Sequence, residues 1–452
     1  MPIAAAVVLG AASLLVAHPL GYDAWSWMVW ARELLHGDLQ TAGGPAIKAL
    51  PVIVMAPLTP LGGAAPLLWL ALMRISALVA LLLAYRVGER LSGRIAGVTA
   101  AGLLVVGPDL YRTALYGSAE PLLLVFVLGA AERFLAGRPR AALALLGAGG
   151  LIRPELWPIV GVLALLLLVE WRRPDPVVLA SAVLPPAIWL SVVWAGSGNP
   201  LSQWISINAT AGPVPGLLPL AAAHGPAVTV LIRLAEAIVL PALVLAAVAV
   251  VDDARHRRVR VPWIAAVAIA WILLVAVMAQ AGYPGSRRYL LGPASLLAVV
   301  AGAGLALVVA SVRGSAARIA VGAALAGVIL LAAFPTIRES AHLVSVAREQ
   351  DRTLSGLRHA VALAGGPRAV LAAGRPAVNP WLQTALAWEM HAPLADVQAT
   401  WGSRRTAPHW HPPAVVFRGP ARLAGPRPVL PAGGHAVRVA RTGGWDVVRV
   451  SG

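Results

Sequence analysis

The sequence contains no cysteine among its 452 residues, and this excludes disulfide bonds, thiolate metal sites and cysteine nucleophiles. Charged residues are also scarce: they make up 12% of the chain, whereas soluble domains carry about 25%. With 59% hydrophobic residues and a mean hydropathy of +0.78, the composition indicates an integral membrane protein. Several runs reach the roughly 20 apolar residues that span a bilayer as a helix.

Acidic residues are few as well, with 19 Asp and Glu against 36 Lys and Arg, so the formal net charge is +17. A charge of this size could suggest a nucleic-acid partner. Most of the arginines, however, fall in short loops between apolar runs, which is typical of the cytoplasmic loops of a membrane protein. The pattern therefore favours a membrane protein without a nucleic-acid partner. The loops are 85–94, 132–140, 170–176, 252–262 and 311–318.

These basic loops predict a polytopic α-helical protein of the cytoplasmic membrane with about 11 transmembrane helices. An odd number of spans puts the N-terminus in the cytoplasm and the C-terminal tail outside. The first apolar segment has no basic region before it, so we expect a retained helix and not a cleaved signal peptide. The expected spans are 2–18, 67–87, 95–110, 119–136, 140–153, 156–171, 176–195, 226–251, 262–280, 289–311 and 315–335.

The composition changes at about residue 336, which predicts two domains. A transmembrane module covers 1–335, and a small soluble extracytoplasmic α/β domain covers 336–452. The segment 336–366 has helical spacing with its charges on one face. The rest of the tail predicts strands at 368–374 and 413–419, a helix at 379–392 and a closing hairpin at 435–452.

Carboxylates and aromatic side chains gather directly behind the first expected span, in "HPLGYDAWSWMVWARELLHGD" (18–38). Asp23 opens an amphipathic helix there, and two interpretations stay open. Its carboxylate caps the helix while the aromatics form an interfacial belt, or it acts as a general base held near the lipid surface. Both can hold, because capping fixes where a carboxylate points.

Three further carboxylates are expected on the outer face. Asp109 lies at the outer end of the third span, and Glu120 opens the fourth span within apolar sequence. A carboxylate at that depth is costly unless it is paired or solvated, although a helix N-terminus also stabilises it. Glu155 follows Arg153 by two residues, so an ion pair between them is the simplest interpretation.

Basic residues on the outer face run against the positive-inside bias. Arg287 and Arg288, followed by Tyr289, lie at an expected outer boundary in "GYPGSRRYLLGP". A planar guanidinium suits phosphate binding, whereas two arginines that reach from a helix end to the interface are the simpler interpretation. Lys48 and Arg74 are weaker basic candidates near the same face.

Together these segments resemble the GT-C superfamily of polytopic glycosyltransferases, which use lipid-linked phosphosugars. The superfamily includes protein O-mannosyltransferases, aminoarabinose transferases and actinobacterial mannosyl- and arabinosyltransferases. The resemblance covers about residues 1–335, and no single motif in it is specific alone. Its motifs are "GYDAWSWMVWARELLHGD", "KALPVIVMAPLTPLGG", "MRISALVALLLAYRVGERLSG", "YGSAEPLLLVF", "LLGAGGLIRPELWPI" and "RRYLLGPASLL".

The resemblance implies an inverting glycosyltransferase. It would move a sugar from a polyprenyl-phosphate donor to an acceptor hydroxyl of a glycan, lipid or protein on the outer face of the membrane. Asp23 falls on the position of the catalytic base. Arg288 and Tyr289, with Arg287 beside them, fall near the donor phosphate. Lys48 stands in "KALP", which keeps only part of the family's element before the second span.

No cofactor is expected, and a divalent metal is not favoured. The first outer loop has no adjacent acidic pair, only Asp23 with the distant Glu33 and Asp38. Metals such as Mg²⁺ or Ca²⁺ are held by oxygen ligands that converge on one point, and this spacing does not indicate such a set.

Other classes of function stay open. A transporter or flippase for a lipid-linked sugar would also need outer-face arginines and aromatics, but it would bury ionisable groups at mid-membrane depth or use broken helices. A structural or assembly protein with an extracytoplasmic domain is a third class. Within the enzymes, one similar to an O-antigen ligase would use a pyrophosphate-linked oligosaccharide instead.

Overall fold

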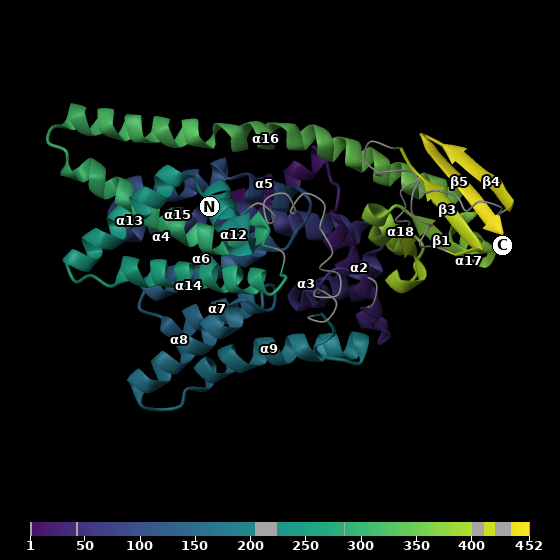
Figure 1. The fold of residues 1–452 in the computed structure, drawn as a ribbon, viewed down its shortest axis with the longest axis horizontal. Helices are drawn as coiled ribbons and strands as arrows, with labels where there is room; N and C mark the ends of the chain where they lie inside the picture. Colours follow the sequence, from purple (N-terminus) through teal and green to yellow (C-terminus); the bar gives the residue numbers. More distant parts are fainter. Residues whose placement is uncertain are drawn as a thin grey trace.

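The computed structural model describes residues 2–41, 44–203, 224–283, 285–399, 411–420 and 435–451. A helical bundle forms most of the molecule, and a small sheet domain lies at one end of its long axis (Figure 1). The helices α2 and α3 lie between the bundle and that domain (Figure 1). Most of the expected outer segment 196–225 falls outside the described residues.

Helices account for nearly all of the described chain up to residue 373. They are α1 (Pro2–Ala12), η1 (Ser13–Leu15), α2 (Tyr22–His36), α3 (Ala49–Met55), η2 (Ala56–Leu61), α4 (Ala64–Val106), α5 (Pro108–Leu115), α6 (Glu120–Leu135), α7 (Pro139–Gly150), α8 (Leu156–Trp171), α9 (Pro176–Ser197), α12 (Pro226–Ala237), α13 (Leu240–Arg255), α14 (Arg260–Gln280), α15 (Arg287–Ser311), α16 (Ser315–Leu363) and α17 (Gly366–Ala373).

The chain is a multi-pass membrane protein, with apolar helices long enough to cross a bilayer. Within the described ranges, five helices meet that length and composition, or six if α12 and α13 count as one span. Four of the expected spans form shorter helices of 11 to 16 residues, namely α1, α6, α7 and α8. The expected total of eleven spans therefore stays a prediction.

The expected span 226–251 is not one continuous helix, because α12 and α13 meet at an angle of 93°. The break falls at Ile238 and Val239, which leave the helical conformation. Pro241 follows in the first turn of α13, and proline is favoured there because its missing N–H has no helical partner to lose.

Two expected spans, 67–87 and 95–110, are the two arms of α4. The chain turns back at Ser92 and Gly93, and Gly93 has a φ of 82°, which glycine adopts without strain. The arms pack tightly, because a Cβ on Gly88 would lie 2.6 Å from the Ala96 carbonyl oxygen. Glycine at this contact lets the two backbones approach.

The helix α16 joins the bundle to the tail domain without interruption. It has 49 residues and is therefore about 73 Å long at a rise of about 1.5 Å per residue. Figure 1 shows it running along one edge of the bundle and on to the sheet. The predicted boundary at 335/336 thus falls inside a helix, and Glu339, beyond that boundary, still contacts Arg287 of the bundle.

The tail domain is α/β, as predicted. A five-stranded sheet has the order β2-β1-β3-β5-β4, in which β1 is parallel to β2 and β3, while β5 is antiparallel to β3 and β4. The hairpin expected at 435–452 is present as β4 and β5. The elements after α17 are β1 (Arg375–Val378), η3 (Pro380–Leu382), α18 (Gln383–Glu389), η4 (Leu394–Asp396), β2 (Gln398–Ala399), β3 (Ala414–Arg418), β4 (His435–Thr442) and β5 (Trp445–Ser451).

One predicted strand of the tail is wrong. Most of the segment 368–374 belongs to the helix α17, and the strand β1 begins directly after it. The Ala- and Leu-rich composition favours a helix. Pro367 stands in the first turn, and Gly374, with a φ of 149°, ends the helix in a conformation that favours glycine.

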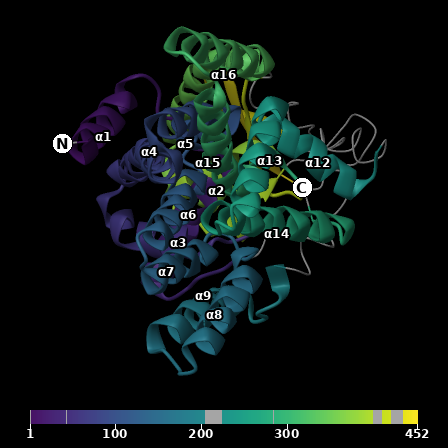
Figure 2. The ribbon, with the colours of Figure 1, turned by 90° about the vertical axis from the view of Figure 1, so that its left-hand side faces the viewer.

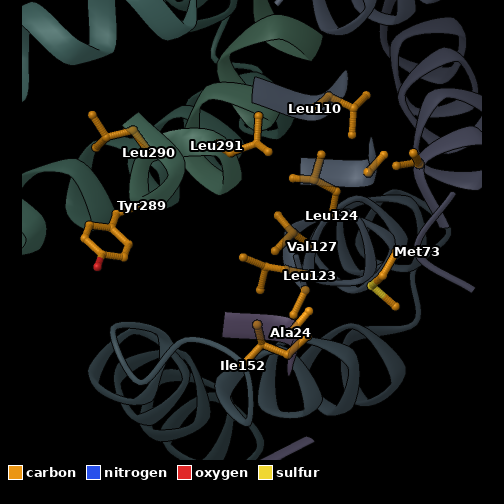
Figure 3. Packing of buried hydrophobic residues seen from close by; sticks show 14 of the residues in the cluster. Ala24, Met73, Leu110, Leu123, Leu124, Val127, Ile152, Tyr289, Leu290 and Leu291 are labelled. Atoms are coloured by element: carbon orange, nitrogen blue, oxygen red, sulfur yellow. The ribbon is translucent and has the colours of Figure 1, made fainter. Parts of the chain in front are cut away.

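The helix α15 forms the centre of the bundle, and most of its residues are buried. Figure 3 shows Leu290 and Leu291 of α15 near Leu124 of α6, in one continuous apolar core. Figure 2, along the bundle, shows α15 surrounded by the other helices. The N-terminal end of this central helix carries Arg287, Arg288 and Tyr289, so the core positions the candidate site.

Candidate active site

The first part of the site is an ion pair between two helix N-termini. Asp23 lies in the first turn of α2, but Gly21 occupies the N-cap position, so Asp23 is not the capping residue. Instead its Oδ2 accepts a 2.5 Å hydrogen bond from Nη1 of Arg288, in the first turn of α15. The structure therefore gives the Asp23 carboxylate an arginine partner in place of the capping role.

This pair is accessible to a ligand. The Asp23 and Arg288 side chains are 18% and 38% exposed, so neither is sealed in the core. The Arg288 guanidinium also lies 5.3 Å from the centre of the Tyr289 ring, a cation–π contact that orients it. A pair of this exposure is screened by solvent and contributes little to stability. The contact therefore matters for where the two side chains are held and not for the stability of the fold.

A second, buried group of charges lies behind the pair. Lys48, directly before α3, donates a 2.9 Å hydrogen bond to Oε1 of Glu120, and Arg153 donates to the same oxygen. All three residues are buried. Glu120 therefore has the paired environment that a carboxylate in apolar sequence needs. The formal charges of these three residues sum to +1, and the buried Glu155 beside Arg153 brings the sum for the whole group to zero.

Tyr289 connects the two groups. The Arg153 guanidinium lies 4.2 Å from the Tyr289 ring centre, so the ring contacts both Arg153 and Arg288. Arg153 also lies 3.9 Å from Glu155, as predicted for that pair. The Glu155 carboxylate in turn accepts a 3.0 Å hydrogen bond from the Tyr283 hydroxyl. Seven of the nine predicted site residues thus lie together. Tyr289 connects the other six, which are Asp23, Lys48, Glu120, Arg153, Glu155 and Arg288.

Burial shifts the pKa of two groups near this site. Burial, together with the Arg153 charge, lowers the pKa of Lys48 to about 8. The attraction of Glu120 offsets only part of that shift. Burial, and then the Asp23 charge, raises the pKa of Tyr22 to about 12. Tyr22 therefore stays neutral at physiological pH, whereas Lys48 lies within reach of a change of charge.

Arg287 and Asp109, the two remaining predicted residues, lie together in a separate cluster. The Arg287 guanidinium is 3.4 Å from Asp109 and 3.2 Å from Glu339 of α16. It is also 3.8 Å from Glu236, which pairs with Arg233 at 2.7 Å. Consecutive helix residues point in directions about 100° apart, so Arg287 and Arg288 cannot face the same partners.

The tail domain contacts α2 beside the ion pair. The Tyr22 hydroxyl donates a 3.2 Å hydrogen bond to Gln383 of α18, and the Tyr22 ring meets Trp381 edge-on at 6.5 Å. Further along α2, Arg32 donates to the Trp388 carbonyl oxygen at 3.3 Å. Trp388 is buried, whereas Trp381 is 58% exposed. The two tryptophans therefore differ in environment, although they are seven positions apart and would share a face of a regular helix.

Sequence reasoning missed Tyr22, Tyr283 and Glu339. Tyr22 directly precedes Asp23, and an aromatic beside a candidate base was a usable signal. The partners of Tyr283 and Glu339 lie 128 and 52 positions away, so only the fold could bring them together.

Among the described residues, no group of three or more His, Asp or Glu side chains could hold a metal ion. Glu33 does not join Asp23: its Oε2 accepts a 2.9 Å hydrogen bond from the Gln40 N–H. Burial raises the pKa of Glu33 to about 7. The expectation that no metal takes part stays a prediction.

Comparison with solved structures identifies the fold of the chain. The crystal structure of ArnT from Cupriavidus metallidurans in the apo state matches over 99% of this chain and 96% of its own, with a TM-score of 0.53 and 16% sequence identity. The chain has the GT-C fold. The GT-C resemblance found in the sequence is thereby confirmed at the level of the fold.

The archaeal oligosaccharyltransferase AglB from Archaeoglobus fulgidus, in complex with an inhibitory peptide and a dolichol-phosphate, matches over 86% of this chain with a TM-score of 0.50 and 13% identity. The chain spans 64% of the length of that protein. No protein-family profile matches the sequence, and no curated protein sequence matches it. The GT-C fold therefore rests on structural similarity.

Proposed function

We propose that the chain is an inverting glycosyltransferase, which moves a sugar from a polyprenyl-phosphate donor to an acceptor hydroxyl at the outer face of the cytoplasmic membrane. The observation that carries the proposal is the 2.5 Å contact between Asp23 and Arg288. It places a carboxylate and a guanidinium, the two groups that such a transfer needs, in one accessible site at the end of a membrane bundle.

The lipid tail of the donor stays in the bilayer, so its phosphate and sugar are held at the membrane surface. Arg288 offers several N–H donors to a phosphate oxygen, and charge-assisted contacts of this kind are strong. In the structure the Asp23 carboxylate occupies one of these donors. A donor phosphate competes with Asp23 for Arg288, and its binding frees the carboxylate.

The freed Asp23 carboxylate then accepts the proton of the acceptor hydroxyl as the hydroxyl oxygen attacks the anomeric carbon. The new bond joins the acceptor oxygen to that carbon on the face opposite the phosphate, so the anomeric configuration inverts. The bond from the carbon to the phosphate oxygen breaks, and its electron pair stays on the leaving polyprenyl phosphate. Arg288 stabilises the charge that grows there.

The buried charges behind the pair set the electrostatic potential of the site. Lys48 and Arg153 together balance Glu120 and Glu155, so the buried group next to Tyr289 has no formal net charge while Lys48 is protonated. Loss of the Lys48 proton would leave a net negative charge there, and in a low-dielectric environment that charge would disfavour a bound phosphate. Lys48 and Arg153 act through their charge without touching the phosphate, and Tyr289 keeps the Arg288 guanidinium in place.

The fold supports this proposal through two relatives. ArnT has the same fold over nearly the whole chain. The AglB structure contains a dolichol-phosphate, so the fold accommodates a lipid phosphate. For this chain the sugar is proposed to be a hexose or pentose, as in mannosyl- or arabinosyltransfer, and the acceptor is proposed to be a glycan, lipid or protein.

One observation favours the second candidate, a transporter or flippase for a lipid-linked sugar. The 93° break between α12 and α13 is the kind of broken helix that transporters use. However, the charged residues beside it, Arg233 and Glu236, pair with each other at 2.7 Å. Pairing of this kind removes the unpaired polar groups that would hold a substrate at the break.

A panel of radiolabelled polyprenyl-phosphate sugars tests the proposal with the purified full-length protein and a membrane extract as the source of acceptor. We expect one sugar to be transferred and an equal amount of polyprenyl phosphate to be released. If no sugar in the panel is consumed, although ligand binding or thermal unfolding shows a folded protein, the transferase proposal is wrong.

A further inference from the structure

A cavity of about 240 Å³ opens on the side of the bundle, away from the candidate active site. Four helices contribute to it, α6, α7, α8 and α14, and Leu296 of α15 closes its inner wall. Apart from Glu170 at the end of α8, every lining side chain is apolar. Lining residues at its outer edge, such as Leu166 and Trp263, are exposed, so the cavity is open toward the surrounding lipid.

The cavity lies near the opposite end of the bundle from Asp23. Along α6, Glu120 belongs to the active-site network, whereas Phe134 lines the cavity fourteen residues later. At a rise of about 1.5 Å per residue, these two residues are about 21 Å apart along the helix. On α6 the lining runs from Val127 to Phe134, so the cavity reaches from about the middle of the bundle to the end opposite Asp23. Its end at Phe134 and Glu170 therefore belongs to the other leaflet from the candidate active site.

Three exposed arginines that form no ion pair within the described chain are close in sequence to lining residues at this end of the cavity. Arg138 precedes the lining residue Pro139, Arg172 follows Glu170 by two positions, and Arg260 precedes Trp263 by three. All three are exposed, and no carboxylate of the described chain lies within ion-pair distance of them. By contrast, their neighbours Arg140 and Arg258 pair with Asp175 and Asp253.

We propose that this cavity binds an anionic phospholipid of the leaflet opposite the candidate active site. One acyl chain fills the cavity, and the phosphate contacts Arg138, Arg172 and Arg260. An apolar cavity of about 150 Å³ takes up a molecule of the size of benzene, so this cavity has room for part of an acyl chain. Basic pockets between transmembrane helices recognise anionic headgroups in the same way. The proposal does not depend on the proposed function.

The charges near the mouth of the cavity are mixed, but the three arginines outnumber the one carboxylate, so the expected lipid is anionic. Glu170 is exposed at the mouth of the cavity, and it repels a phosphate directly above it. The phosphate is therefore displaced toward the loops, where the arginines outnumber this carboxylate. Glu170→Gln removes the repulsion, so we expect this variant to retain at least as much anionic lipid as the wild type.

Native mass spectrometry of the purified full-length protein, with phosphatidylglycerol as the probe, tests the site. The test variant carries Arg138→Ala, Arg172→Ala and Arg260→Ala. The control carries Arg86→Ala, Arg94→Ala and Arg313→Ala, which are exposed arginines in other loops of the same expected face and change the net charge equally. We expect at least a fivefold loss of bound lipid in the test variant only. Equal retention in the two variants, or equal loss, would overturn the proposal.

Photo-crosslinking gives a second readout that needs no variant. Phosphatidylglycerol with a photoreactive acyl chain is reconstituted with the wild-type protein in nanodiscs. We expect labelled peptides from the cavity wall, around Leu143 and Leu163, with excess phosphatidylglycerol competing more strongly than phosphatidylethanolamine. Even labelling of all lipid-facing helices, or stronger competition by polyprenyl phosphate, would contradict an anionic phospholipid site.

Discussion

Asp23 and Arg288 lie 265 positions apart in the chain, yet the Arg288 guanidinium donates a 2.5 Å hydrogen bond to the Asp23 carboxylate. Each group therefore neutralises the other until a ligand separates them. A donor phosphate is a better partner for Arg288 than a solvent-exposed carboxylate, because it offers more oxygen acceptors and more negative charge. Donor binding and activation of the base are thus coupled through one arginine.

The two adjacent arginines give opposite expectations. Arg288→Ala removes the proposed phosphate contact, so we expect the KM for the donor to rise by about 10-fold or more, which corresponds to a charge-assisted hydrogen bond of about 1.5–3 kcal/mol. Arg287→Ala instead breaks the contacts to Asp109 and Glu339. We expect it to lower the melting temperature with a smaller effect on KM.

Donor titrations and thermal unfolding of both variants measure the difference. Unchanged donor affinity in both single variants and in the double variant would remove the arginines from the site.

The pKa of Lys48 predicts an alkaline limit of activity. Lys48 is charged below its pKa of about 8 and loses its positive charge as the pH rises through that value. Because this charge favours phosphate binding, we expect kcat/KM for the donor to fall above about pH 8. Lys48→Arg keeps its charge, so the fall should move beyond pH 10. Rates between pH 6 and 10 measure the effect, and an identical alkaline limit in both proteins would rule Lys48 out as its cause.

The exposed Trp381 predicts a role of the tail in acceptor binding. Its ring lies beside Tyr22, next to Asp23, and an exposed aromatic face suits the apolar face of a sugar. We expect Trp381→Leu to raise the KM for a glycan acceptor several-fold and to leave donor hydrolysis by water nearly unchanged, while Trp381→Phe keeps most of the affinity. Trp194→Leu, at an exposed tryptophan of the bundle, is the matched control. Equal loss of transfer and hydrolysis would mean that Trp381 supports the catalytic site itself.

The tail as a whole should lie outside the cytoplasm if the predicted odd number of spans with basic inner loops is correct. We expect alkaline phosphatase fused after Ser451 to be active and the same reporter fused after His256 to be inactive. The reverse pattern would invert the topology and place Asp23 in the cytoplasm.

Local sequence patterns predicted the helices and the end of the tail well. Apolar runs gave α9, α14 and α15 within a few residues, and the pair Gly443-Gly444 between two alternating segments gave the hairpin of β4 and β5. Such features depend on neighbours in the chain. The helix α17 was misread as a strand because short apolar segments fit both structures.

The pairing of the charges could not be predicted in the same way. The sequence placed Arg287 and Arg288 together, whereas the geometry of α15 directs them to different clusters. Lys48, Glu120 and Arg153 each had a plausible local explanation, and only the fold shows that they share one carboxylate oxygen. Long-range contacts of this kind are set by helix packing, which a single sequence does not reveal.

The most direct test of the central claim is Asp23→Asn, measured for donor binding and for transfer in the same proteoliposomes. Asp38→Asn, at an exposed acid just beyond the end of α2, is the matched control. We expect Asp23→Asn to bind the donor at least as well as the wild type, because Arg288 no longer holds a carboxylate. Transfer should fall by about 10²–10⁴-fold, since the base is lost. Transfer above about one tenth of the wild-type rate would contradict a base at Asp23.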